Sequence, residues 1–206
     1  LPLALLAVEL LAAFAGGMIA TAQEKPLWEN NSPPSEAAAL DVYQQHLAAI
    51  GKGDRTPLAK RIFDVLLACG GLVLSAPVWM AATVWIWLED PGPVLFVKNS
   101  VGKGGRNFLQ LKFRSMVQGA EENTGPVLAA QSDERVLLAG KFLRKTALDE
   151  LPQLVNILRG EMSFVGPRPQ RTVLVRSYLQ SIPEYTERHR VLPGLAGLAQ
   201  VAGDYY

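Results

Sequence analysis

The chain has 206 residues, and its 20 lysine and arginine residues against 19 aspartate and glutamate residues leave a formal net charge of +1. This balance excludes the basic surface of a general nucleic-acid-binding protein, and a hydrophobic content of 49% against 19% charged residues excludes dominant disorder. The single cysteine and two histidines exclude a disulfide framework and a zinc site built from these residues alone. The mean hydropathy of +0.14 is high for a soluble protein.

The first apolar segment covers residues 1–22 and carries one charge, Glu9. At ~1.5 Å per residue it is long enough to cross a bilayer core of ~30 Å, so a transmembrane helix is predicted. A signal peptide is the alternative, although no basic region precedes the apolar run. The chain starts at Leu1 without a methionine and stops at Tyr206. We therefore expect a fragment of a longer protein.

Residues 23–57 contain four prolines and are interpreted as a linker that encloses a short helix over 35–50. Ser35 suits the N-terminal cap of this helix and Gly51 its C-terminal cap. Apolar residues between them recur at spacings of three and four, which predicts one packed face.

Residues 62–88 form the second apolar segment, with Asp64 as its only charge and Pro77 near its middle. A proline removes a backbone hydrogen bond and kinks or breaks a helix. Basic residues flank the segment on both sides, which indicates that both ends face the cytoplasm. We therefore expect a re-entrant helix over about 60–88, broken at Pro77, with Ser75 bonding a carbonyl that the proline frees. A kinked spanning helix is the alternative.

From Val94 onward the pattern changes. The stretches VLFVKN and NFLQLKF flank the turn GKGG, which predicts a β-hairpin, because no serine or threonine follows the lysine as a phosphate-binding loop requires. Residues 134–145 are interpreted as a short helix that ends in basic residues. The predicted fold class is α+β and mostly α, membrane-associated, with a broken helix, a small hairpin and a compact cytoplasmic domain.

The densest polar stretch starts with Asp149 and Glu150. Apolar spacing predicts a helix that begins near Asp149, because Pro152 is tolerated only in a first turn, and that ends at Gly160. Asp149 is then either a simple N-terminal cap or part of a site. Arg144 lies close in sequence, and Arg168 is fixed between two prolines. Adjacent carboxylates near such arginines are typical of a Mg²⁺-diphosphate site.

The chain carries four blocks in this order: KRIFDVLL, LKFRSM, FLRKTALDELPQLVNILRGEMSFVGPRP and LPGLAGLAQV. Together they strongly resemble the bacterial sugar transferase family, the monotopic phosphoglycosyl transferases that start glycan assembly on a lipid carrier. The resemblance implies a phosphoglycosyl transferase domain over 58–206, truncated at its C-terminus, with a catalytic part over 94–206. It places that part on the cytoplasmic face of the bacterial inner membrane.

The resemblance also implies the reaction. By analogy, Asp149 attacks the β-phosphate of a UDP-sugar, UMP leaves, and undecaprenyl phosphate then takes the sugar phosphate to start exopolysaccharide, O-antigen, capsule or glycoprotein glycan assembly. Asp149 and Glu150 are implied to bind Mg²⁺, and Glu150 alternatively activates the acceptor. The implied phosphate- and nucleotide-binding residues are Arg144, Pro167, Arg168, Pro169, Lys112 and Arg114.

Three positions depart from the family pattern. Ala76 precedes Pro77 where serine is common, and Leu192 and Ala202 stand where arginine and asparagine are frequent. The departures at Leu192 and Ala202, together with the expected truncation and the additional helix over 35–50, motivate an alternative function, a catalytically silent homologue that acts as a membrane scaffold or assembly subunit. The expected partners are the UDP-sugar, undecaprenyl phosphate and the lipid bilayer, without nucleic acid, and a homo-oligomer stays open.

Overall fold

A computed structural model describes residues 45–46, 48–120 and 133–202. The transmembrane helix expected over 1–22 and most of the linker lie outside these residues. The end of the helix expected over 35–50 is helical at its described positions, 45–46 and 48–50. Gly51 follows with a φ of +58°, the left-handed conformation that suits a C-terminal cap.

The chain divides into two compact units. The first unit contains Cys69–Val97 and Leu111–Leu154; the second contains the described parts of Trp28–Ala68, Lys98–Gln110 and Val155–Tyr206. One long helix and the two strands of a hairpin run through both units. The architecture is a mostly helical α+β fold with one long apolar helix and small sheets, as the sequence predicts.

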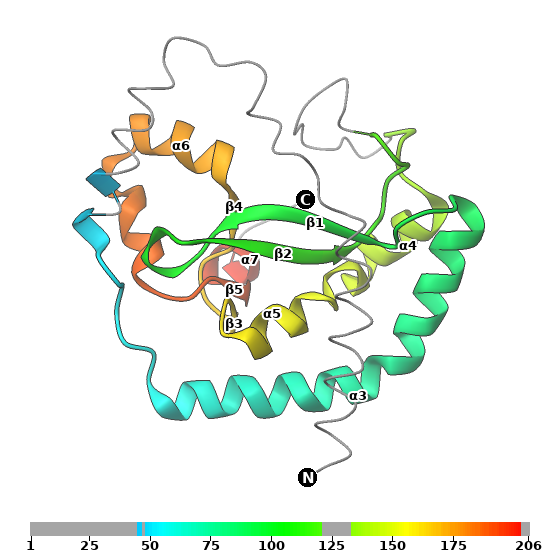
Figure 1. The fold of residues 1–206 in the computed structure, drawn as a ribbon, viewed down its shortest axis with the longest axis horizontal. Coiled ribbons are helices and arrows are strands. Elements are labelled where there is room, and N and C mark those ends of the chain that lie inside the picture. Colours follow the sequence, from blue (N-terminus) through cyan, green and yellow to red (C-terminus); the bar gives the residue numbers. More distant parts are fainter. Residues whose placement is uncertain (1–44, 47, 121–132, 203–206) are drawn as a thin grey trace. The chain divides into compact units, whose positions relative to one another are not determined.

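Helix α3 (Leu58–Glu89) spans 32 residues with Pro77 inside it. It is the one helix in the described part of the chain that is long and apolar enough to cross a membrane. Its ribbon bends near the middle but stays continuous (Figure 1). The expected break is therefore absent, because one missing N–H removes a single hydrogen bond from the helical ladder. The Ser75 hydroxyl donates to the Leu72 carbonyl at 3.4 Å. Pro77 frees the carbonyl four residues before it, that of Val73, so the prediction that Ser75 bonds the freed carbonyl is wrong.

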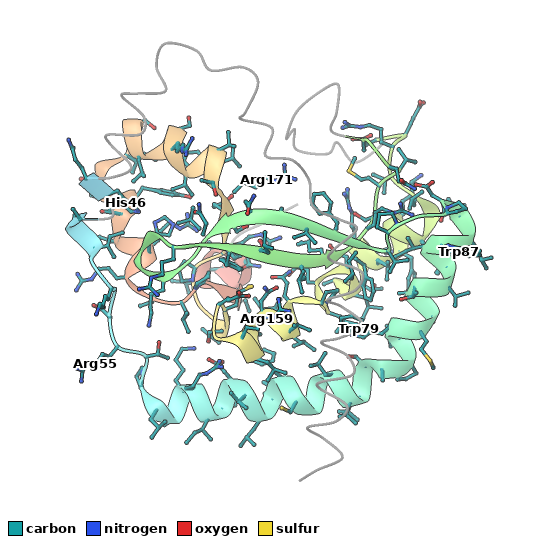
Figure 2. All side chains as sticks on the ribbon, in the orientation of Figure 1. His46, Arg55, Trp79, Trp87, Arg159 and Arg171 are labelled. Atoms are coloured by element: carbon teal, nitrogen blue, oxygen red, sulfur yellow. The ribbon has the colours of Figure 1, made fainter. Side chains whose placement is uncertain are left out.

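The two faces of α3 differ in burial. Its buried side chains recur every three or four residues, at positions 64, 68, 72, 75, 79, 82 and 86. The opposite face is also apolar but exposed, with Leu74 81% and Trp87 54% accessible. Figure 2 shows Trp87 pointing outward, whereas Trp79 lies on the inner side of the helix, where it packs edge-on against Phe113. An exposed apolar face of this length indicates contact with lipid or another apolar surface.

Strands β1 (Leu95–Val101) and β2 (Asn107–Phe113) form the predicted hairpin, and β4 (Gln170–Arg171) pairs antiparallel with β1 (Figure 1). Gly104 in the connecting 3-10 turn η1 (Lys103–Gly105) has a φ of +65°, which glycine adopts without strain. The remaining elements are α4 (Leu138–Lys145), η2 (Leu148–Glu150), α5 (Gln153–Arg159), β3 (Ser163–Val165), α6 (Thr172–Ser181), η3 (Pro183–Arg190), β5 (Gly194–Ala196) and α7 (Leu198–Ala202).

Candidate active site

The two adjacent carboxylates lie in a tight turn of the first unit. Asp149 and Glu150 belong to the 3-10 turn η2, and α5 begins only at Gln153. The prediction that an α-helix begins near Asp149 is therefore wrong. Pro152 has no N–H, so the i to i−4 ladder cannot pass through it, and i to i−3 bonds such as Leu151 N–H to the Leu148 carbonyl at 3.2 Å replace it.

The residue before this turn, Ala147, has a φ of +55° and a ψ of +15°. This left-handed conformation is uncommon for a residue with a side chain, and such strain is concentrated at functional sites. It reverses the chain between α4 and η2, so that basic residues at the end of α4 and the two carboxylates follow one another closely.

Lys112, on strand β2, joins both carboxylates. Its Nζ lies 2.6 Å from Glu150 Oε1 and 3.5 Å from Asp149 Oδ2. All three side chains are largely buried, with 11–16% of their area accessible. Within the described residues, Lys112 is the hydrogen-bond donor to the Asp149 carboxylate, and no backbone N–H bonds it. The interpretation of Asp149 as a simple N-terminal cap is therefore wrong.

Burial raises the pKa of Asp149 above its ordinary value, and Glu150 raises it further by repulsion. The positive charges of Lys112 and Arg144 act in the opposite direction. The structure thus brings together four predicted site residues in one unit, and we call Lys112, Arg144, Asp149 and Glu150 the carboxylate cluster. It combines a desolvated carboxylate with two cations that act to lower its pKa.

The donor chemistry of the cluster fits a divalent cation. Lys112 already places one positive charge between the two carboxylates. In the described residues no group of three or more histidine, cysteine or acidic side chains is arranged to hold a metal. Mg²⁺ commonly binds through one or two carboxylates together with substrate phosphates, which matches this donor set.

Arg114 lies in the same unit but is engaged elsewhere. Its guanidinium donates to the carbonyl oxygen of Asp90, and Nη1 lies 3.6 Å from Asp90 Oδ2. Strand β2 ends at Phe113, so Arg114 does not continue the face that carries Lys112. Burial lowers the pKa of Arg114. The structure places Arg114 as a clamp on the segment after α3, rather than beside the two carboxylates.

The Gly-Pro-Arg-Pro loop lies in the second unit. Gly166 donates to the Ala196 carbonyl at 3.0 Å and Gly194 donates to the Pro167 carbonyl at 2.9 Å. A Cβ at Gly166 would lie 2.3 Å from the Leu192 carbonyl oxygen, and one at Gly194 2.1 Å from the Gly166 nitrogen. These glycines therefore allow two backbones to pack on each other. Pro169 is buried, and Pro167 and Arg168 are half-buried.

Sequence reasoning missed a polar network that secures this loop. Asp64, fully buried in α3, accepts hydrogen bonds from the Ser163 hydroxyl at 2.9 Å and the Phe164 N–H at 3.1 Å. Lys60 contacts Asp64 at 3.7 Å, and its ammonium donates to the Ser163 hydroxyl. The sequence carried a signal for this network, because Asp64 is the only charge in the apolar segment 62–88 and a lone charge there requires polar partners.

A family model described as "Bacterial sugar transferase" matches residues 55–206. A UDP-N-acetylgalactosamine-undecaprenyl-phosphate N-acetylgalactosaminephosphotransferase of Aeromonas hydrophila is 47% identical over 71% of this chain and 34% of its own length. A UDP-glucose:undecaprenyl-phosphate glucose-1-phosphate transferase of Caulobacter vibrioides is 46% identical over 71% of this chain and 54% of its own. An Escherichia coli protein of that same name is 43% identical over 80% of this chain and 34% of its own. The chain thus spans a third to about half of these relatives.

Proposed function

Because the chain belongs to the bacterial sugar transferase family, we propose that it transfers a sugar 1-phosphate from a UDP-sugar to undecaprenyl phosphate and releases UMP. The observation that carries this proposal is the carboxylate cluster, in which Lys112 lies against a buried Asp149 and Glu150. A carboxylate in such a position can act as a nucleophile toward phosphorus. The named relatives act on the same two substrate classes.

The proposed reaction has two steps. An oxygen of Asp149 forms a bond to the β-phosphorus of the UDP-sugar, while the bond from that phosphorus to the bridging oxygen breaks and UMP leaves with the electron pair. A phosphate oxygen of undecaprenyl phosphate then attacks the same phosphorus, and the bond to Asp149 breaks. The products are a lipid diphosphate sugar and a regenerated carboxylate. Two successive steps at one carboxylate avoid assembling both bulky substrates at once.

The other cluster residues have distinct proposed roles. Glu150 and Asp149 would hold Mg²⁺, which when bound would neutralise part of the diphosphate charge. Lys112 holds both carboxylates in place and supplies a cation for an incoming phosphate. Arg144 binds phosphate oxygens through its guanidinium. Arg168 binds the nucleotide phosphates from the loop that Pro167 and Pro169 restrict.

We further propose that α3 enters and leaves the membrane on the cytoplasmic side of the inner membrane. The bend of its ribbon (Figure 1), its exposed apolar face and the basic residues on both flanks support this path. Leu58→Cys and Asn99→Cys, each in a Cys69→Ser background, are labelled in intact cells with a membrane-impermeant maleimide. Protection of both until lysis is expected, whereas labelling of only one in intact cells contradicts the re-entrant path.

UMP release tests the activity itself. We expect Mg²⁺-dependent UMP release from at least one UDP-sugar when undecaprenyl phosphate is present, and none from Asp149→Asn. A panel with UDP-glucose, UDP-galactose and their N-acetylated forms covers the donors. Release from none of them by folded wild-type protein contradicts the transferase and supports the silent scaffold that the departures at Leu192 and Ala202 motivate.

A further inference from the structure

Arg144 is held by one of its three guanidinium nitrogens. Its Nε donates to the Ser115 hydroxyl at 2.8 Å. In the part of the chain that the structure describes, Nη1 and Nη2 have no hydrogen-bond acceptor. An arginine anchored through Nε presents the remaining two nitrogens as a planar fork, the geometry that matches two oxygens of one phosphate.

Ser115 is held in place by the backbone of α4 itself. The Ser115 carbonyl accepts the N–H of Leu137 at 3.1 Å, directly before α4. A Cβ on Gly140 would lie 2.0 Å from the same carbonyl oxygen, so the helix crosses this residue at closest approach. Glu89 accepts the N–H groups of Leu138 and Ala139 and so secures the first turn of α4. The hydroxyl of Ser115 is therefore fixed relative to the helix that carries Arg144.

The segment 112–115 is linked to both cations of the carboxylate cluster, because it contains Lys112 and because Ser115 binds Arg144. Lys112 contacts the two carboxylates from β2, and Ser115 follows it by three residues. Helix α4, which carries Arg144, contacts η2, which carries Asp149, and the charge of Arg144 acts on Asp149. A fork oriented from Ser115 therefore belongs to the helix that packs against the turn at which the proposed reaction occurs.

We propose that Ser115 is a positioning residue, which orients Arg144 so that its two outer nitrogens bind a phosphate group of a substrate at Asp149. This inference rests on the proposed function. The phosphate belongs either to the diphosphate of the UDP-sugar or to undecaprenyl phosphate, and both present the same pair of oxygens. Ser115 touches neither substrate and acts through the arginine alone.

A double-mutant cycle tests this inference through binding, so it does not depend on turnover. In an Asp149→Asn background, dissociation constants for UDP and for undecaprenyl phosphate in nanodiscs are measured for Ser115→Ala, Arg144→Ala and the double variant. We expect Ser115→Ala to weaken one of the two ligands by roughly tenfold, and to add nothing once Arg144 is alanine. The weakened ligand identifies which phosphate the fork holds.

A conservative variant separates positioning from folding. Ser115→Thr keeps the hydroxyl and should restore binding, and in the active enzyme Ser115→Ala should raise the KM of the same substrate more than it lowers kcat. Unchanged binding of both ligands in Ser115→Ala overturns the inference, as does a full additional loss in the Arg144→Ala background. If the binding cycle gives the expected result but the wild type releases no UMP, the proposed reaction is contradicted and the role of Ser115 in orienting Arg144 is not.

Discussion

Asp149 is a carboxyl group with two opposed requirements. In the proposed reaction it must be ionised to attack phosphorus, and it must be shielded from water so that hydration does not weaken its attack. Burial raises its pKa, and Lys112 and Arg144 counter that effect. Because Lys112 contacts both carboxylates, it is the cation whose removal should alter this balance most.

Replacing Lys112 by methionine should shift the pH dependence of UMP release. Without the ammonium the pKa of Asp149 rises further, since Lys112 lowers it. On acidification, the rate of UMP release by Lys112→Met should therefore begin to fall at a higher pH than that of the wild type. Initial rates between about pH 5 and pH 9 measure this shift. Lys141→Met, at an exposed position on α4, is the control, and an acid limb that stays in place in Lys112→Met contradicts the role.

Asp149→Asn should stabilise the protein while it removes activity. Burial raises the pKa of Asp149 above its value in the unfolded chain. Such a group lowers the free energy of unfolding as the pH rises from the unfolded to the folded pKa, and this destabilisation persists at pH 7. The variant is therefore expected to have a higher Tm at pH 7, with the gain shrinking as the pH falls toward 4. Calorimetry over this pH range provides the measurement.

Asp133→Asn is a control in which the expected change of Tm at pH 7 has the opposite sign, a decrease. The hydrogen bonds from Arg135 lower the pKa of Asp133 to about 2, so its charge stabilises the fold above the unfolded pKa. The loss of Tm in Asp133→Asn should shrink as the pH falls through the interval between those two values. A lower Tm for Asp149→Asn at pH 7 contradicts the assigned cost of burying its charge.

At the scale of elements, α4 approaches the segment after β2 through backbone, at Gly140 and Ser115, in addition to the side-chain hydrogen bond from Arg144 to Ser115. Gly140 permits this contact, because a Cβ there would lie 2.0 Å from the Ser115 carbonyl oxygen. The sequence predicts α4, the hairpin and the end of α5 at Gly160, since each follows from local spacing and turn residues. It does not predict that α4 crosses Ser115, because that contact joins residues 25 positions apart.

Gly140→Ala should destabilise the first unit and disturb the cluster together. Overpacking against fixed backbone costs ~1–3 kcal/mol or more, and a shift of α4 moves Arg144. The Tm and the rate of UMP release should therefore both be lower than in the wild type. Gly70→Ala in α3 is the matched control, since a Cβ there meets nothing within 4 Å. Equal changes of Tm and of UMP release in Gly140→Ala and Gly70→Ala contradict the close contact of Gly140 with the Ser115 carbonyl.

The start of α5 shows why local pattern was insufficient. Apolar spacing extends to Leu151, which favoured a helix from Asp149 onward. The left-handed Ala147 and the missing N–H of Pro152 instead produce a 3-10 turn, and this turn directs Asp149 and Glu150 toward Lys112. The departure from regular helix therefore occurs where the proposed chemistry requires it.

At the scale of the whole molecule, each unit holds a part of the family's sequence blocks. The first unit holds LKFRSM and the two carboxylates, and the second holds KRIFD, the Gly-Pro-Arg-Pro loop and the glycine-rich block. The sequence identified these blocks and named the four residues of the carboxylate cluster among its site candidates, but it did not predict that Lys112 contacts both carboxylates. It could not reveal that Asp64 bonds Ser163, because the two residues are 99 positions apart and pair only through the fold.

Trapping the covalent intermediate tests the central claim most directly. Full-length chain is incubated with Mg²⁺ and a UDP-sugar labelled at the β-phosphate, without undecaprenyl phosphate, and is then quenched and analysed by mass spectrometry. We expect a burst of UMP of about one equivalent and a sugar phosphate on Asp149, which added undecaprenyl phosphate removes. Turnover with lipid acceptor but neither burst nor label without it would contradict Asp149 as the nucleophile.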